Sequence, residues 1–213
     1  SVGGLDIEFN HGKGETDDHT WAWVPKAKTL VTGDLVLWVF PNAGNPQKVQ
    51  RYPLEWANAL REMMTCEAEL LVPAHGLPIK GTGRINRVLG DLAHVLETLV
   101  SETLELMNDG YQLNDIVHMV KVDQEMLGLP WLQPLYDEPE FVVRNIWRMY
   151  GGWWDADPAS LKPSPRVDLA KELSVLAGGA KQLADRAKFL AEEGDLRLSC
   201  HLIEFAALAE PDN

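Results

Sequence analysis

The chain has 213 residues, of which 46% are hydrophobic and 24% are charged, a composition typical of a globular protein with a sizeable core. The formal net charge is −13 and the sequence pI is about 4.8. This acidity argues against binding to nucleic-acid phosphates and against attraction to anionic membranes. No apolar run reaches the roughly 18 residues that a membrane span requires.

The first 80 residues carry mainly strand patterns. Residues 5–9 alternate between apolar and polar side chains, which predicts a strand. The apolar runs 21–24 and 29–32 flank a charged Pro-Lys turn and predict a hairpin. A further apolar run covers residues 35–40, and a loop rich in Pro, Asn and Gly follows at 41–46. We expect the chain to begin inside a domain, and its compartment, cytoplasmic or periplasmic, stays unknown.

A helix is predicted from Pro53, because Pro favours the first helical turn and apolar residues then recur on one face. A short buried strand over residues 69–72 follows. The order strand, strand, helix, strand is typical of an α/β or α+β layer.

After Pro78 the pattern becomes helical throughout. Apolar residues repeat every three or four positions from residue 82 to 107, and Gly110 lies where a left-handed cap is expected. Further helices are predicted over residues 114–120, 140–150, 167–192 and 195–209. The last two have a tetratricopeptide-like spacing of small residues, which we interpret as an ordinary helical hairpin, since one pair is weak evidence of a repeat.

Three residues with metal-ligating side chains stand at turns beside apolar runs: Glu15 in Gly-Glu-Thr, Asp34 after Gly33, and His75 in Pro-Ala-His-Gly. Carboxylate and imidazole donors at strand ends can hold zinc in an open coordination sphere. Each also has an ordinary interpretation, as a solvated loop carboxylate or a common turn residue. The three donors cannot complete such a site alone.

The spacing of these motifs resembles the second half of the metallo-β-lactamase superfamily, in which a Gly-His-Thr loop, a strand ending in Gly-Asp and a later His supply metal ligands. Glu15 stands where most members have His, which resembles the alkylsulfatase branch. The helical half also resembles the dimerisation domain of that branch, through residues 106–111, 150–155 and 190–195.

This resemblance implies an α+β fold: the C-terminal half of an αββα sandwich in residues 1–80, followed by an all-α dimerisation domain in residues 81–213. It implies a zinc-dependent hydrolase with two ions per complete site, in which a metal-bound hydroxide attacks an ester-like bond. Glu15 would bind the first metal, Asp34 would lie on or between both, and His75 would bind the second. Asp34 and Glu15 suit this role, because a carboxylate can bridge two cations.

The resemblance also implies partners: the N-terminal half of the same hydrolase, which can be a separate chain, a second copy bound through the helical domain, and a small anionic or amphiphilic substrate such as an alkyl sulfate. The family's His-x-His-x-Asp-His run is absent from these residues, and Leu35–Trp38 stand where sulfate-binding residues are expected. Two alternatives therefore stay open. The chain can belong to another hydrolase of this fold, acting on a lactone, thioester or phosphodiester, or it can be a non-catalytic helical interaction module with a degenerate half-site.

Three further residues are weaker candidates. Arg144 and Arg148 lie on a predicted helix in the segment where the related branch contacts its substrate, and arginine can hold an anionic group through two hydrogen bonds. An ion-paired or solvated helix face is the simpler interpretation of both. His19 could support a ligand from behind as a partner of the metal-binding residues, although a polar loop residue is the simpler interpretation.

Overall fold

The computed structural model describes residue 1 and residues 3–211. Val2, Asp212 and Asn213 lie outside the described residues. The chain divides into two compact units, Ser1–Ala156 and Asp157–Asn213, and each is described below by itself.

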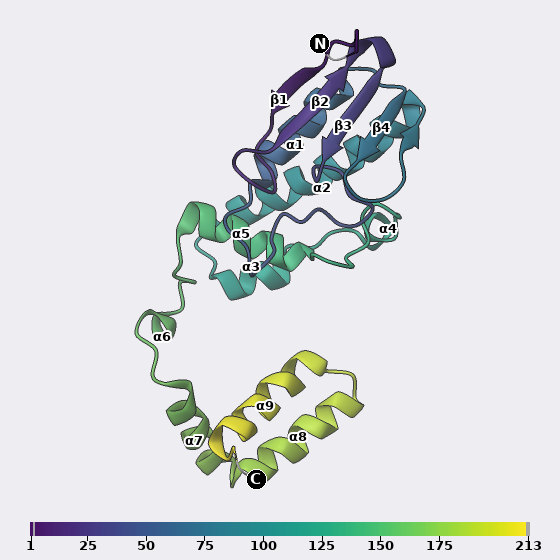
Figure 1. Cartoon of the computed structure of the whole chain (residues 1–213). Helices are drawn as coiled ribbons and strands as arrows, with labels where there is room; N and C mark the ends of the chain where they lie inside the picture. Colours follow the sequence, from purple (N-terminus) through teal and green to yellow (C-terminus); the bar gives the residue numbers. More distant parts are fainter. Residues whose placement is uncertain (2, 212–213) are drawn as a thin grey trace. The chain divides into compact units, whose positions relative to one another are not determined.

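The first unit begins with a five-stranded mixed sheet in which the strands lie side by side in chain order (Figure 1). Its strands are β1 (Glu8–His11), β2 (Thr20–Val24), β3 (Thr29–Gly33), β4 (Leu70–Pro73) and β5 (Ile79–Lys80). β2 and β3 form the predicted antiparallel hairpin around the short 3-10 turn η1 (Pro25–Ala27). β3 and β4 are parallel, whereas all other neighbours are antiparallel.

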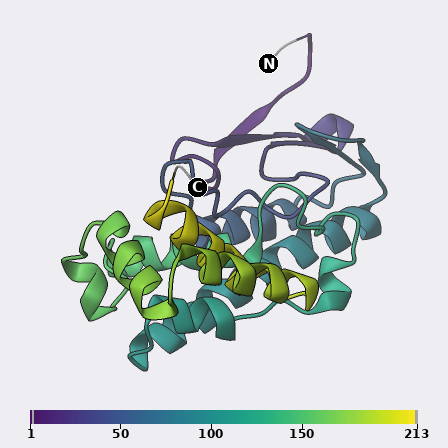
Figure 2. The ribbon, with the colours of Figure 1, turned by 90° about the horizontal axis from the view of Figure 1, so that it is seen from below.

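The parallel pair β3–β4 is connected by helix α1 (Pro53–Met64), which begins at the predicted proline. Helix α1 packs against α2 (Thr82–Asn108), the longest helix, and both lie on one side of the sheet (Figures 1 and 2). Side chains from both helices and from the inner face of the strands form one core, which includes Leu30, Leu71, Trp56 and Leu89.

The apolar run 35–40 is not a strand in the structure. It runs as an irregular segment along the core, with Leu35, Val36 and Phe40 almost completely buried. The apolar composition of this run therefore indicated that it is buried, but not that it pairs as a strand. Short apolar runs commonly have this ambiguity. The predicted strand over residues 5–9 is also shifted, since β1 covers Glu8–His11.

Three further helices complete the first unit: α3 (Leu113–Met119), α4 (Gln124–Leu127) and α5 (Pro139–Gly151). Helix α5 packs against α2 and α3. The start of α5 also touches the loop at Gly44, where an added Cβ atom would come within 2.1 Å of the Val142 nitrogen. Helix α5 thereby holds the loop that connects the buried run 35–40 to α1.

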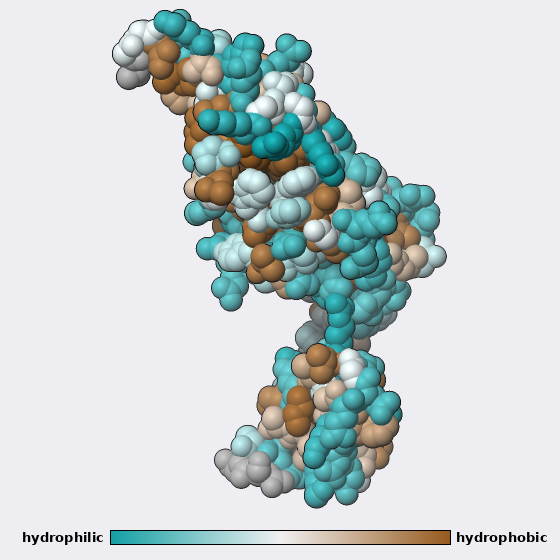
Figure 3. All heavy atoms as spheres, turned by 90° about the vertical axis from the view of Figure 1, so that its right-hand side faces the viewer, coloured by the Kyte–Doolittle hydropathy of each residue, from teal (hydrophilic) through white to brown (hydrophobic). Residues whose placement is uncertain are grey.

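The second unit consists of α6 (Pro158–Leu161), α7 (Arg166–Ala177), α8 (Ala180–Glu192) and α9 (Leu196–Ala209). The predicted continuous helix 167–192 is wrong, because Gly178 (φ 89°) and Gly179 (φ 130°) end α7 before α8 begins. Helices α8 and α9 form the predicted hairpin, and α7 packs against both. Figure 3 shows hydrophobic residues at the surface of this unit beside a band of hydrophilic ones, in keeping with the exposed Val175 and Leu176.

The predicted fold class, an α+β part followed by an all-α part, is confirmed. The two compact units meet after Ala156, whereas the predicted domain boundary lies at residue 80. The positions differ because side chains of α2 belong to the same core as those of the sheet. That boundary stays a prediction. None of the described helices is both long and apolar enough to cross a membrane.

Candidate metal-binding site

The three predicted ligands lie at one edge of the sheet. Gly33 at the end of β3 is paired with Pro73 at the end of β4. Because parallel strands end at the same edge, Asp34 and His75 emerge side by side. Glu15 reaches the same edge from the loop between β1 and β2, since β2 begins next to the end of β3.

The loop that carries Glu15 is held by close packing. The amide of Gly12 donates to the carbonyl of His19 across the base of the loop, at 2.9 Å, and the amide of Tyr52 donates to the carbonyl of Gly14, at 3.0 Å. A Cβ atom at position 14 would lie only 2.5 Å from Leu35 Cδ2. Glycine is therefore needed beside Glu15 for the loop to rest on the buried run 35–40.

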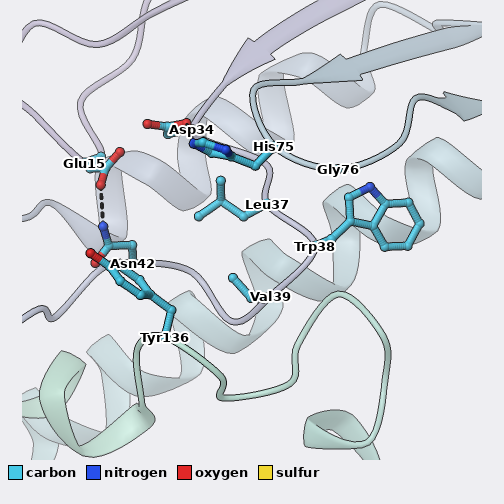
Figure 4. Close-up of a pocket in the computed structure, with 9 residues that line it drawn as sticks. All are labelled: Glu15, Asp34, Leu37, Trp38, Val39, Asn42, His75, Gly76 and Tyr136. Atoms are coloured by element: carbon cyan, nitrogen blue, oxygen red, sulfur yellow. Dashed lines mark hydrogen bonds and ion pairs between the residues drawn. The ribbon is translucent and has the colours of Figure 1, made fainter.

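Glu15, Asp34 and His75 line one pocket of about 440 Å³. In Figure 4, Asp34 lies between the other two. The rest of the wall is mainly apolar or aromatic and consists of Leu37, Trp38, Val39, Asn42, Gly76 and Tyr136. The pocket thus combines a polar end with an apolar wall, an arrangement typical of sites for small ligands.

Glu15 lies between a cation and an anion. Its Oε1 atom accepts a hydrogen bond from Asn42 Nδ2 and lies 3.3 Å from a guanidinium nitrogen of Arg51, whose side chain is only 5% exposed. Burial and the nearby Asp34 carboxyl group raise the pKa of Glu15, while Arg51 and Asn42 act in the opposite direction. Two crowded carboxyl groups are an environment that a bound cation would stabilise.

Asp34 and His75 are neighbours, with 3.5 Å between Asp34 Oδ1 and His75 Nε2. Asp34 Oδ1 is buried, and no described residue donates a hydrogen bond to it. Within the described part of the chain, however, no three Asp, Glu, His or Cys side chains close around one point that could hold a metal ion. The donor types and the orphaned oxygen fit one side of a zinc site, and the spacing fits a site that needs further ligands.

The weaker candidates lie elsewhere. His19 Nε2 is 3.3 Å from the Thr32 carbonyl oxygen, behind Gly33 and outside the pocket lining. Arg144 and Arg148 line a separate pocket of about 190 Å³ with Gly44 and Phe141. Arg148 donates to Gln50 Oε1 at 3.0 Å and to Asn145 Oδ1 at 3.1 Å. The structure therefore brings Glu15, Asp34 and His75 together, and places the two arginines apart from them.

Sequence reasoning missed a buried polar group behind Glu15. Arg51 is 4% exposed and Asn42 is also 4% exposed. Asp137 is fully buried and accepts hydrogen bonds from the amides of Gly44 and Glu138, at 2.7 and 2.9 Å. Burial raises the pKa of Asp137, and Arg51 is among the groups that lower it. No spacing signal links these residues, because they come from two irregular segments that are far apart in the sequence.

Comparison with known proteins shows which class of protein this chain resembles. Residues 112–213 match the family described as alkyl sulfatase dimerisation. The whole chain is 26% identical to a linear primary-alkylsulfatase of Pseudomonas sp. (strain ATCC 19151) and 26% identical to an alkyl/aryl-sulfatase of Saccharomyces cerevisiae. The structure of a stereoselective inverting sec-alkylsulfatase, Pisa1 from Pseudomonas sp., matches 100% of this chain with a TM-score of 0.89 and 25% identity.

The chain thus carries an alkylsulfatase dimerisation domain and is homologous to alkylsulfatases along its whole length. The resemblance to this branch, and the α+β part followed by a helical region, are confirmed. The chain spans only 41% and 34% of those two relatives, and 34% of the matched Pisa1 chain. The activity of the complete relatives is therefore a proposal for this chain.

Proposed function

We propose that this chain supplies the Glu15, Asp34 and His75 side of the zinc site of an alkylsulfatase-like hydrolase. The observation that carries the proposal is the meeting of these three side chains at one sheet edge, in one pocket. Bound zinc would polarise the substrate ester and lower the pKa of water. The chain's own contribution is to place two carboxylates and an imidazole around that position.

The pocket wall suits a substrate with an anionic head and a short apolar part. The head would lie at the polar end, and the apolar part would contact Leu37, Trp38 and Val39, which line the same pocket. An alkyl sulfate has this chemistry. Cleavage of an alkyl sulfate and of a phosphodiester, offered side by side to the complete enzyme, separates the sulfatase from another hydrolase with the same ligands.

The sheet offers a surface for the missing part of the enzyme. Phe9, Ala22, Val31 and Val72 are paired across four strands. Because strand side chains alternate, they lie on the face opposite to buried Leu30 and Leu71. Phe9 is 73% exposed and Val31 is 42% exposed. We propose that this apolar stripe packs against the N-terminal half of the hydrolase, and that residues 112–213 join two copies of the chain.

Zinc binding tests the proposal. Because the chain holds one side of the site, we expect the purified chain to bind zinc weakly in equilibrium dialysis, and Asp34→Ala to weaken this binding at least tenfold further, since Asp34 is the central donor of the three (Figure 4). Asp6→Ala is the matched control, because this exposed carboxylate precedes β1 and so lies at the end of that strand opposite to the loop that carries Glu15. Equal zinc binding by wild type and Asp34→Ala would overturn the metal site and favour the non-catalytic interaction module, the alternative that the open spacing of the three donors also allows.

A further inference from the structure

Two buried side chains converge on the same oxygen of Glu15. Asn42 Nδ2 donates a hydrogen bond to Oε1, and an Arg51 guanidinium nitrogen lies 3.3 Å from that same atom. The other carboxylate oxygen points toward Asp34 in Figure 4. The two oxygens of one side chain therefore have different surroundings.

Arg51 is itself held firmly. Its amide donates to Asn145 Oδ1 at 3.3 Å, and its carbonyl accepts from Asn145 Nδ2 at 2.9 Å. Asn145 belongs to α5 and is almost fully buried. The main chain of Arg51 is thus tied to a helix, and its almost fully buried side chain places a guanidinium nitrogen beside Glu15. The buried guanidinium group also balances the charge of the partly buried Glu15 carboxylate.

We infer that Asn42 and Arg51 are positioning residues that occupy Glu15 Oε1, so that Glu15 offers a metal ion its Oε2 atom alone. A carboxylate can otherwise bind a cation through one or both oxygens, which changes the coordination number and the geometry. Groups behind a ligand commonly set its orientation, and their loss lowers metal affinity about 10- to 100-fold. This inference rests on the proposed zinc site.

Two charge-conserving variants test it. Asn42→Leu removes the donor without changing charge and keeps the branching at Cγ, although leucine is the larger side chain. Arg51→Lys keeps the charge and removes the planar guanidinium group. We expect each to raise the zinc dissociation constant about tenfold or more in equilibrium dialysis with zinc chloride. We also expect X-ray absorption at the zinc edge to show an altered oxygen shell as Glu15 Oε1 becomes free to bind.

Asn58→Leu and Arg84→Lys make the same chemical changes at exposed helical positions and are the matched controls. Thermal melts in EDTA verify that each variant folds, and Asn42→Ser replaces Asn42→Leu if the leucine variant does not. Wild-type affinity within twofold together with an unchanged zinc spectrum in both variants would overturn the positioning role and leave the zinc site intact. Absence of zinc binding by the wild-type chain would overturn both.

Discussion

At the scale of single residues, the pKa of Glu15 depends on the balance between burial and Asp34, which raise it, and Arg51 and Asn42, which lower it. Burial and the Asp34 carboxyl group raise its pKa above the ordinary value of 4.5, against the effect of Arg51. The native chain therefore holds this proton more tightly than the unfolded chain does. The stability that this provides is present in full below the unfolded pKa and is lost as the pH rises through the folded pKa.

Glu15→Gln removes this titration. We expect the unfolding free energy of the variant, relative to wild type, to increase as the pH is raised from about 4.5 through the raised pKa of Glu15, and then to level off. Urea unfolding of both proteins in EDTA between pH 4.5 and 8 measures the difference. Micromolar protein concentrations are needed, because the sequence pI of about 4.8 lies in this range. A difference that falls with increasing pH would contradict the raised pKa.

The residues of the candidate site divide into those that a pattern can reveal and those that it cannot. Asp34 and His75 each follow a short apolar strand, so a strand-end rule finds them. Arg51 and Asn42 lie in a loop whose composition is typical of loops in general. Their approach to Glu15 depends on the tertiary packing of the loop against α5, which local sequence does not encode.

At the scale of elements, the turn after β4 decides where His75 lies. Gly76 has φ 94°, and a Cβ atom there would come within 1.7 Å of Trp38 Cδ1. Trp38 Nε1 also donates to the Leu77 carbonyl at 2.8 Å. The indole ring of the buried segment 35–40 therefore fixes the backbone that follows His75.

Gly76→Ala introduces both a strained backbone and a steric clash. We expect it to lower the unfolding free energy by about 2–4 kcal/mol, from left-handed strain and overpacking together, and to weaken zinc binding as His75 moves. Gly83→Ala is the matched control: this glycine is inside α2 with open space around it, so alanine should stabilise the chain by about 0.4–1 kcal/mol. Urea unfolding measures the change in unfolding free energy for both variants. An equal change in Gly76→Ala and Gly83→Ala would contradict the packing of Trp38 on Gly76.

Elements with a strong periodic signal were predicted well, since α1 and α2 begin where the proline and the loop indicate. Two errors have physical causes. The run 35–40 buries most of its apolar side chains in the core, although its backbone does not pair as a strand. The helix over 167–192 is interrupted, because Gly178 and Gly179 take conformations that side chains with a Cβ atom rarely adopt.

At the scale of the whole molecule, each unit has its own apolar cluster. The main cluster lies entirely within residues 1–156, and a small one that includes Leu183 and Ala206 lies in the second unit. A unit with its own core can fold alone, so we expect the fragment 1–156 to fold by itself. This fragment also contains every residue that we place in the proposed zinc site.

We expect this fragment to unfold in one cooperative step, with a midpoint within about 4 °C of the corresponding transition of the full chain. Circular dichroism during heating measures the transition. Chymotrypsin should release a similar fragment by cutting near Trp153, which is 76% exposed. A fragment without a cooperative transition would show that the second unit is required for the fold.

The parallel pairing of β3 with β4 also has a kinetic consequence. Asp34 and His75 are 41 positions apart in the chain, and the crossover through α1 must close before they meet. Closing so long a segment costs conformational entropy before any contact offsets it. We therefore expect donor atoms from the two strand ends to come together late in folding, so that the capture of a metal ion would indicate that this crossover has formed.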